Sequence, residues 1–245
     1  MMKKQPPERI VSLVPSLTEF VVDLGLRKNL AGRTRFCAEP AGKIEDTPII
    51  GGTKNPNIDK IKDLNPDLII ANKEENRKEH IEQLSSFANV YLSEITSVDD
   101  ALIALHELGE ELGAPDKAGE IVDSAVKKLN QRPDEPETTA AYLIWREPWM
   151  AVGNKTYIHD VLKKWNITNV FGYKERYPEI TFEHLELLEP ELILLSSEPY
   201  PFKEKHVKEL QESFAQSRIL LVDGTWFSWY GSRMAWAFEK LNTWR

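Results

Sequence analysis

Residues 57–70 read Asn-Ile-Asp-Lys-Ile-Lys-Asp-Leu-Asn-Pro-Asp-Leu-Ile-Ile, and residues 181–194 read Thr-Phe-Glu-His-Leu-Glu-Leu-Leu-Glu-Pro-Glu-Leu-Ile-Leu. Each copy places three apolar residues on one helical face and then a proline, which ends a helix because it disfavours the α conformation in the residue before it. An acid and a continuous apolar run follow, a pattern typical of a strand buried on both faces of a parallel sheet. The chain therefore contains one helix-to-strand unit in each half.

The rest of the chain extends this pattern to two α/β lobes. Residues 1–96 and 133–245 each carry short apolar runs separated by helical patterns, whereas residues 97–132 show only the period of helices. We therefore expect an N-terminal α/β lobe, a connecting helical segment and a C-terminal α/β lobe with these boundaries, both lobes containing Rossmann-like parallel sheets. Ser16 and Glu19 have the spacing of a capping box, which predicts that Ser16 starts the first helix.

Composition and charge argue against several classes of function. The net charge of −8 argues against a nucleic-acid partner, which favours a basic surface. No apolar run is long enough to span a membrane. Cys37 is the only cysteine and the histidines are scattered, so we expect no intrinsic metal or cofactor. The first residues contain no apolar export segment, which leaves two locations open: cytoplasmic if Met1 is the true start, and periplasmic or otherwise extracytoplasmic if an export signal was removed.

Candidate ligand-binding residues lie where strands are expected to end. Parallel α/β sheets bind ligands beyond the carboxyl ends of their strands, and two lobes facing each other would put those ends across one ligand cleft. Four tryptophans at such ends favour a flat ligand, although each alone is as easily explained by core packing: Trp145, Trp149, Trp226 and Trp229. Arginines there could receive an anionic group or pair with nearby glutamates. The candidate set is Ser16, Arg33, Arg35, Thr53, Lys54, Asn72, Arg146, Trp149, Tyr177 and Trp226.

Asp59 and Glu183 occupy the same place in the two copies of the repeat. Each is expected at the second helical position, after Asn57 or Thr181 as the N-cap. In isolation, an acid there is best explained by compensation of the helix dipole. Two equivalent acids, one in each lobe, could also dock on a symmetric basic partner.

The order of these motifs resembles the helical-backbone (class III) substrate-binding proteins of ABC importers, the group that carries cobalamin, ferric siderophores and haem. The resemblance covers nearly the whole chain, and its clearest marks are residues 9–19, 51–56, 64–70, 188–194 and 223–226. It implies two lobes bridged by a long α-helix, with a cobalt or iron chelate held between them. It also implies that Asp59 and Glu183 engage arginines on the two subunits of an ABC permease dimer.

Within that group the cobalamin-binding proteins are the most similar. Tyr177 falls where they place a cleft aromatic residue, and Trp149 or Met150 falls near another. Thr53 and Asn72 depart from the pattern, because they replace cleft tryptophans of the N-terminal lobe. Arginines at positions 33, 35 and 146 would suit an anionic ferric chelate or haem propionates instead.

Three hypotheses for the function follow. The first is a non-catalytic substrate-binding component of an ABC importer that captures a metal chelate, either a corrinoid or a ferric siderophore or haem. The second is an enzyme, such as a tetrapyrrole metal chelatase, which would use His184 beside Glu183. The third is a cytoplasmic carrier or sensor of a similar ligand.

Overall fold

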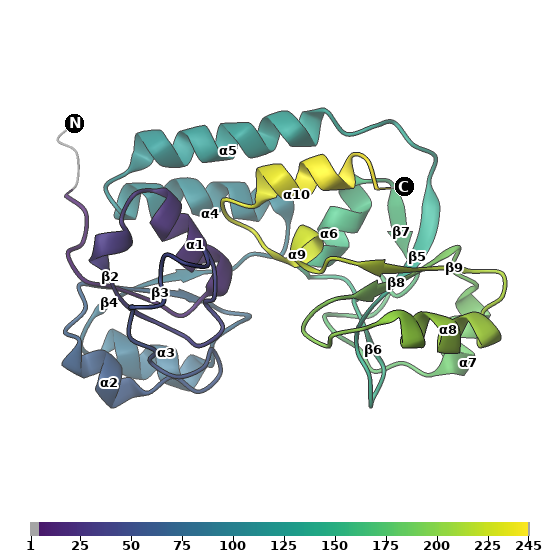
Figure 1. Ribbon diagram of the computed structural model, residues 1–245, viewed down its shortest axis with the longest axis horizontal. Coiled ribbons are helices and arrows are strands. Elements are labelled where there is room, and N and C mark those ends of the chain that lie inside the picture. Colours follow the sequence, from purple (N-terminus) through teal and green to yellow (C-terminus); the bar gives the residue numbers. More distant parts are fainter. Residues whose placement is uncertain (1–4, 245) are drawn as a thin grey trace. The chain divides into compact units, whose positions relative to one another are not determined.

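The computed structural model describes residues 5–244 of the chain (Figure 1). They form two compact units. The N-terminal unit contains the chain up to Ile95, then Asp99–Lys127 and Tyr230–Ala235, and the C-terminal unit contains Thr96–Val98, Lys128–Trp229 and the chain from Trp236 on. The path of the chain therefore passes between the units several times.

The N-terminal unit is built on a parallel four-stranded sheet of order β2-β1-β3-β4. Its central strand β3 is buried at all five positions, as the unalternating apolar run predicts. The strands are β1 (Ile10–Ser12), β2 (Leu30–Arg33), β3 (Leu68–Asn72) and β4 (Asn89–Ser93). The helices are α1 (Pro15–Asp23), the 3₁₀ turn η1 (Arg27–Asn29), α2 (Ile58–Asp63) and α3 (Lys78–Ser85).

Residues 97–132, predicted as helical, form two helices. These are α4 (Val98–Glu111) and α5 (Pro115–Asn130), and Gly113 lies between them with a positive φ of 68°. Most of α4 belongs to the N-terminal unit, and α5 contributes residues to both units.

The C-terminal unit repeats the parallel arrangement, with the order β6-β5-β8-β9 and β7 paired to β5. One strand, β6, is antiparallel to β5 and was not predicted. The strands are β5 (Thr138–Trp145), β6 (Met150–Ala151), β7 (Ile167–Asn169), β8 (Leu192–Ser196) and β9 (Arg218–Val222). The helices are α6 (Tyr157–Lys164), α7 (Phe182–Leu188), α8 (Glu204–Ser213), α9 (Thr225–Ser228) and α10 (Met234–Leu241). The predicted α/β class with parallel sheets is confirmed.

The repeated stretch folds as the same local structure in both units. The Asn57 side chain accepts a hydrogen bond from the Lys60 backbone N–H at 2.9 Å, and the Thr181 hydroxyl accepts one from the His184 N–H at 3.3 Å. Both helices end before the proline, and the two residues that precede the prolines, Asn65 and Glu189, have positive φ angles of 44° and 41°. The predicted caps and helix ends are therefore confirmed.

The acid after each proline fastens the repeat to the neighbouring strand. The Asp67 carboxylate accepts hydrogen bonds from the backbone N–H groups of Glu8 and Arg9, both at 2.9 Å, just before β1. The Glu191 carboxylate accepts one from the Thr139 N–H at 2.8 Å, at the start of β5. Because the hydrogen bond from the Thr139 N–H favours the charged form of Glu191, it lowers the pKa of this carboxyl group.

The predicted capping box at Ser16 is wrong. Helix α1 begins at Pro15, its N-cap is Val14, and no side chain caps it. Proline fits the first helical position because it has no N–H to leave unsatisfied. The Glu19 side chain, expected to reach back to the helix start, accepts a hydrogen bond from Arg233 at 2.6 Å instead.

Across residues 5–244, no helix is long and apolar enough to cross a bilayer.

Candidate binding site

At the carboxyl edge of the N-terminal sheet, Asn76 holds two loops together. Its side-chain amide donates to the Thr53 carbonyl at 3.0 Å, and its side-chain oxygen accepts from the Asn72 backbone N–H at 2.9 Å. The Lys54 ammonium reaches the Glu74 carbonyl. The backbone N–H of Arg35 donates to the Gly51 carbonyl at 2.9 Å, which brings the loop after β2 to the same edge. Four predicted site residues therefore share one edge: Arg35, Thr53, Lys54 and Asn72.

Four predicted residues in this unit are largely withdrawn from solvent: Ser16, Arg33, Thr53 and Asn72. The Asn72 amide donates to the Ser93 hydroxyl at 3.1 Å, and its side-chain oxygen accepts from the Glu74 N–H at 2.8 Å. These bonds use the side chain to shape the loop after β3. Asn72 therefore supports the edge, and its polar atoms are not directed at solvent.

Arg33 does not lie on the exposed rim that the anion-binding hypothesis requires. It is 8% exposed, and its guanidinium donates to the carbonyls of Ile44 at 3.0 Å and Cys37 at 2.8 Å. A buried guanidinium needs such acceptors, and here the loop after β2 supplies them. Arg33 thus holds that loop in place, while Arg35, two residues later, is exposed.

Phe36 is an exposed aromatic residue at the same edge and is not among the predicted site residues. Its side chain is 57% exposed. It lies close to Gly52, where an added Cβ would come within 3.2 Å of the phenyl ring. The available signal was an aromatic residue next to Arg35, in the loop that follows β2.

In the C-terminal unit, Arg146 and Trp149 are tied to neighbouring side chains. The Arg146 guanidinium donates to Glu209 at 2.7 Å and lies 5.6 Å from the centre of the Trp149 ring. Trp149 in turn packs against Phe182 and Phe202, with ring centres 5.4 and 5.8 Å away. Trp149 therefore serves mainly as core, and Arg146 already has an anionic partner.

Tyr177 lies in a segment that pairs with β6. The Ala151 N–H donates to the Pro178 carbonyl at 3.0 Å and the Gly153 N–H donates to the Arg176 carbonyl at 2.6 Å, on either side of Tyr177. Gly153 permits this approach, because a Cβ there would lie 2.2 Å from the Lys174 carbonyl oxygen. Tyr177 is half-buried at this outer edge of the sheet.

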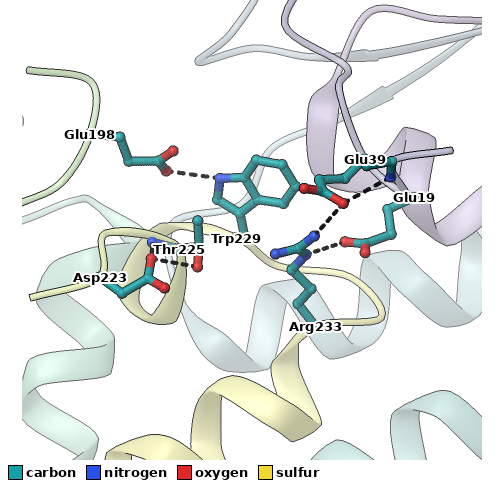
Figure 2. Close-up of polar contacts among 8 residues, drawn as sticks. Glu19, Glu39, Glu198, Asp223, Thr225, Trp229 and Arg233 are labelled. Carbon is teal, nitrogen blue, oxygen red and sulfur yellow. Dashed lines mark hydrogen bonds and ion pairs between the residues drawn. The ribbon is translucent and has the colours of Figure 1, made fainter. Parts of the chain in front are cut away.

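Among the tryptophans after β9, Trp229 rather than Trp226 joins the strand-end loops. Trp226 packs edge-on against Trp236 of α10, with ring centres 6.2 Å apart. The indole N–H of Trp229 donates to the Glu198 carboxylate at 2.8 Å (Figure 2). The same oxygen accepts from the Ser228 hydroxyl at 2.8 Å. Glu198 follows β8, so this contact joins the loops after β8 and β9.

Gly224 is required for this junction. A Cβ at Gly224 would lie 2.5 Å from the Ser196 hydroxyl and 2.6 Å from the Glu198 side chain. One residue earlier, the Asp223 carboxylate accepts from the Thr225 N–H at 3.0 Å and from its hydroxyl at 2.7 Å, which shapes the turn into α9 (Figure 2). The loop that carries Trp229 is therefore well ordered by its own contacts.

Trp145 adds a second aromatic group at the carboxyl edge of this sheet. It ends β5, is 39% exposed, and lies edge-on to Tyr200 with ring centres 5.8 Å apart. Each unit thus presents exposed or half-exposed aromatic side chains where its parallel strands end: Phe36 in one, and Trp145, Tyr200 and Trp229 in the other.

Asp59 and Glu183 are both exposed at the second residue of their helices, α2 and α7. A hydrogen bond from the Thr181 hydroxyl lowers the pKa of Glu183. Glu183 is therefore ionised at neutral pH.

Residues 10–221 match the model of a protein family described as periplasmic binding protein. The chain belongs to the periplasmic binding protein family. The resemblance to substrate-binding proteins is thereby confirmed at the level of the family. This is a class of binding proteins and not a class of enzymes.

Individual relatives of this periplasmic binding protein are distant in sequence but extend over most of its length. A vitamin B12-binding protein of Photorhabdus laumondii is 24% identical over 246 residues, which cover 96% of this chain and 86% of the relative. An ABC transporter substrate-binding lipoprotein of Bacillus subtilis is 26% identical over 205 residues, 78% of this chain and 64% of the relative.

Solved structures show the same fold. The periplasmic vitamin B12-binding protein BtuF of Vibrio cholerae superimposes with a TM-score of 0.85 at 21% identity, covering 98% of this chain and 97% of that one. A periplasmic haem-binding protein of Pseudomonas aeruginosa gives a TM-score of 0.82 at 22% identity, covering 96% and 91%.

Proposed function

We propose that this protein captures a corrinoid of the cobalamin class and delivers it to an ABC importer. The observation that carries the proposal is the set of aromatic side chains at the carboxyl edges of both sheets, above all Phe36, Trp145 and Trp229. A corrin presents broad apolar faces, against which aromatic rings pack favourably. The names of the vitamin B12-binding relatives support the same class of ligand.

The arginines favour a corrinoid over a polyanionic chelate. Arg33 is buried against backbone carbonyls and Arg146 is paired with Glu209, so neither is available as a receptor for carboxylates. Arg35 alone of the three is exposed. Haem or an anionic ferric chelate remains the second candidate, and Arg35 is the observation that favours it.

The proposed partner is the permease dimer of the importer. Asp59 and Glu183 offer one exposed carboxylate in each unit, at equivalent positions of the repeat. Such charges suit arginines on two permease subunits. Delivery to an importer requires an extracytoplasmic location, which the proposal includes, and it requires no catalysis.

An enzymatic role is not favoured by the position of His184. It lies on the exposed first turn of α7 next to Glu183 and does not itself stand at a strand end. His184→Ala should therefore leave ligand affinity unchanged.

The experiment is a calorimetric and fluorescence titration with four ligands: cyanocobalamin, dicyanocobinamide, haem and a ferric siderophore. We expect saturable binding of the two corrinoids with quenching of tryptophan emission. Phe36→Ala should weaken corrinoid binding about ten-fold. The ring is exposed in the free protein and would be buried against the ligand, and alanine removes this apolar contact. Ile103→Ala is the control, because Ile103 is 59% exposed and lies on helix α4 rather than in a strand-end loop. If neither corrinoid gives heat of binding or quenches tryptophan emission, the proposal is overturned. If haem binds more tightly than the corrinoids, the ligand is instead haem or an anionic ferric chelate.

A further inference from the structure

The two copies of the repeat differ at one exposed position next to the paired acids. Leu187 is 80% exposed on α7, the most exposed of the large hydrophobic side chains in the described residues. It stands four residues after Glu183, so the two side chains share one face of the helix. The corresponding residue of the first copy, four residues after Asp59, is Asp63, which is also exposed.

Leu187 is not part of the apolar stripe that holds α7 to its unit. That stripe is Phe182, Leu185 and Leu188, which pack against the core of the C-terminal unit. A single exposed leucine carries little information by itself. Here, however, it lies one turn from an ionised carboxylate, in the position where the otherwise matching helix carries a second acid.

We propose that Leu187 is an apolar anchor of the docking face on α7, and that it enters a hydrophobic recess of the permease beside the basic residue that receives Glu183. This inference rests on the proposed function, because it names the contact chemistry of the same partner. The face on α2, with Asp59 and Asp63, docks through charge alone. The two faces therefore differ in their response to salt: screening weakens the carboxylate contacts and leaves the leucine contact intact.

The partner that fits has two different features within one helical turn. An arginine or lysine meets Glu183, and an apolar pocket about one turn away accepts a branched aliphatic side chain. On the α2 side the partner needs only basic groups.

The test measures binding of the full-length protein to the permease dimer in nanodiscs, at low and at high salt. Leu187→Ser should weaken binding about ten-fold or more, the loss expected when most of a leucine contact is removed. Asp63→Leu should make the α2 face resemble the α7 face and reduce the salt dependence of binding. Asp63→Asn is its matched control, because it removes the charge without adding an apolar group.

Two further controls separate the possible outcomes. Leu221→Ser alters another exposed leucine, 36% exposed on β9, and should not change permease binding. Corrinoid affinity should be unchanged in every variant. If Asp59→Ala and Glu183→Ala weaken permease binding while Leu187→Ser does not, the anchor is refuted and the proposed function stands. If the wild-type protein binds corrinoid but never the permease, the delivery function fails together with the anchor.

Discussion

The guanidinium of Arg233 donates to the carboxylate of Glu19 at 2.6 Å, although 214 residues separate them in the sequence (Figure 2). A second carboxylate, that of Glu39, lies 3.0 Å from the same guanidinium. Burial raises the pKa of Glu19, which opposes its ionisation, while Arg233 acts in the other direction. The pair fastens the segment Tyr230–Ala235 to the N-terminal unit.

Replacing Arg233 should destabilise the protein. Arg233→Met leaves the Glu19 carboxylate, which is 9% exposed, without its cation, and we expect a loss of about 2 kcal/mol in the free energy of unfolding. Urea denaturation followed by circular dichroism measures it. Adding Glu19→Gln to Arg233→Met should recover part of the loss, because a neutral amide does not need the cation. A double variant as unstable as the sum of both single variants would contradict this account.

Arg33 should contribute to the stability of the fold, whereas Arg35, on the surface, should not. Arg33→Met removes the donor to two backbone carbonyls, and we expect it to lower the free energy of unfolding by about 2 kcal/mol. Arg35→Met should change stability by no more than about 0.5 kcal/mol, as for most exposed positions. Chemical denaturation of both variants checks this contrast. Equal effects on stability would show that the burial of Arg33 has no energetic role.

The hydrogen bond between Glu198 and Trp229 should affect ligand affinity through the position of the indole. Glu198→Ala removes the acceptor, and we expect corrinoid binding to weaken about five- to ten-fold, the equivalent of one hydrogen bond. Glu198→Gln retains an acceptor and should bind nearly as well as the wild type. Calorimetric titration gives the affinities, and near-ultraviolet circular dichroism reports the environment of the indole. If Gln and Ala have the same effect, the carboxylate does not act by positioning Trp229.

The bonds at Glu191 predict a dependence of stability on pH. Because the folded pKa is lowered, the carboxylate contributes stability above its unfolded pKa, near the ordinary value of 4.5, and this contribution is lost as the pH falls through the lower folded value. Glu191→Gln should therefore unfold at a lower urea concentration at pH 7. The difference from wild type should shrink as the pH falls below about 4.5. Glu186→Gln, an exposed change on α7, is the control, and a difference independent of pH would exclude this explanation.

The local structure of the repeat was predictable because its causes are local. Asn57 and Thr181 cap the helices that follow them, the apolar spacing selects the buried face, and the proline ends each helix. The parallel pairing of β3 with β1 and β4, and of β8 with β5 and β9, agrees with the continuous apolar sequence of these two strands. The helix caps and helix ends in these stretches therefore depend on residues close in the sequence.

The candidate site was less predictable because the local sequence does not specify the contacts that orient its side chains. Arg33 is turned inward by carbonyls of the following loop, and Trp149 is drawn into the core by Phe202. Glu19 satisfies a helix-cap pattern in the sequence, yet its partner is Arg233. An arginine or tryptophan at a strand end has the same local sequence whether it faces ligand or core.

The short segment Tyr230–Ala235 has a consequence for how the gene can be divided. The chain before it and after it belongs to the C-terminal unit, while the segment itself completes the N-terminal unit. No single break in the polypeptide can therefore yield two self-sufficient pieces. A fragment that ends before Tyr230 would lack Arg233, the partner of Glu19. The remaining C-terminal fragment would contain a segment of the N-terminal unit. Whole halves of the chain therefore cannot be exchanged without dividing the N-terminal unit, even though the repeat itself retains the signature of two similar parts.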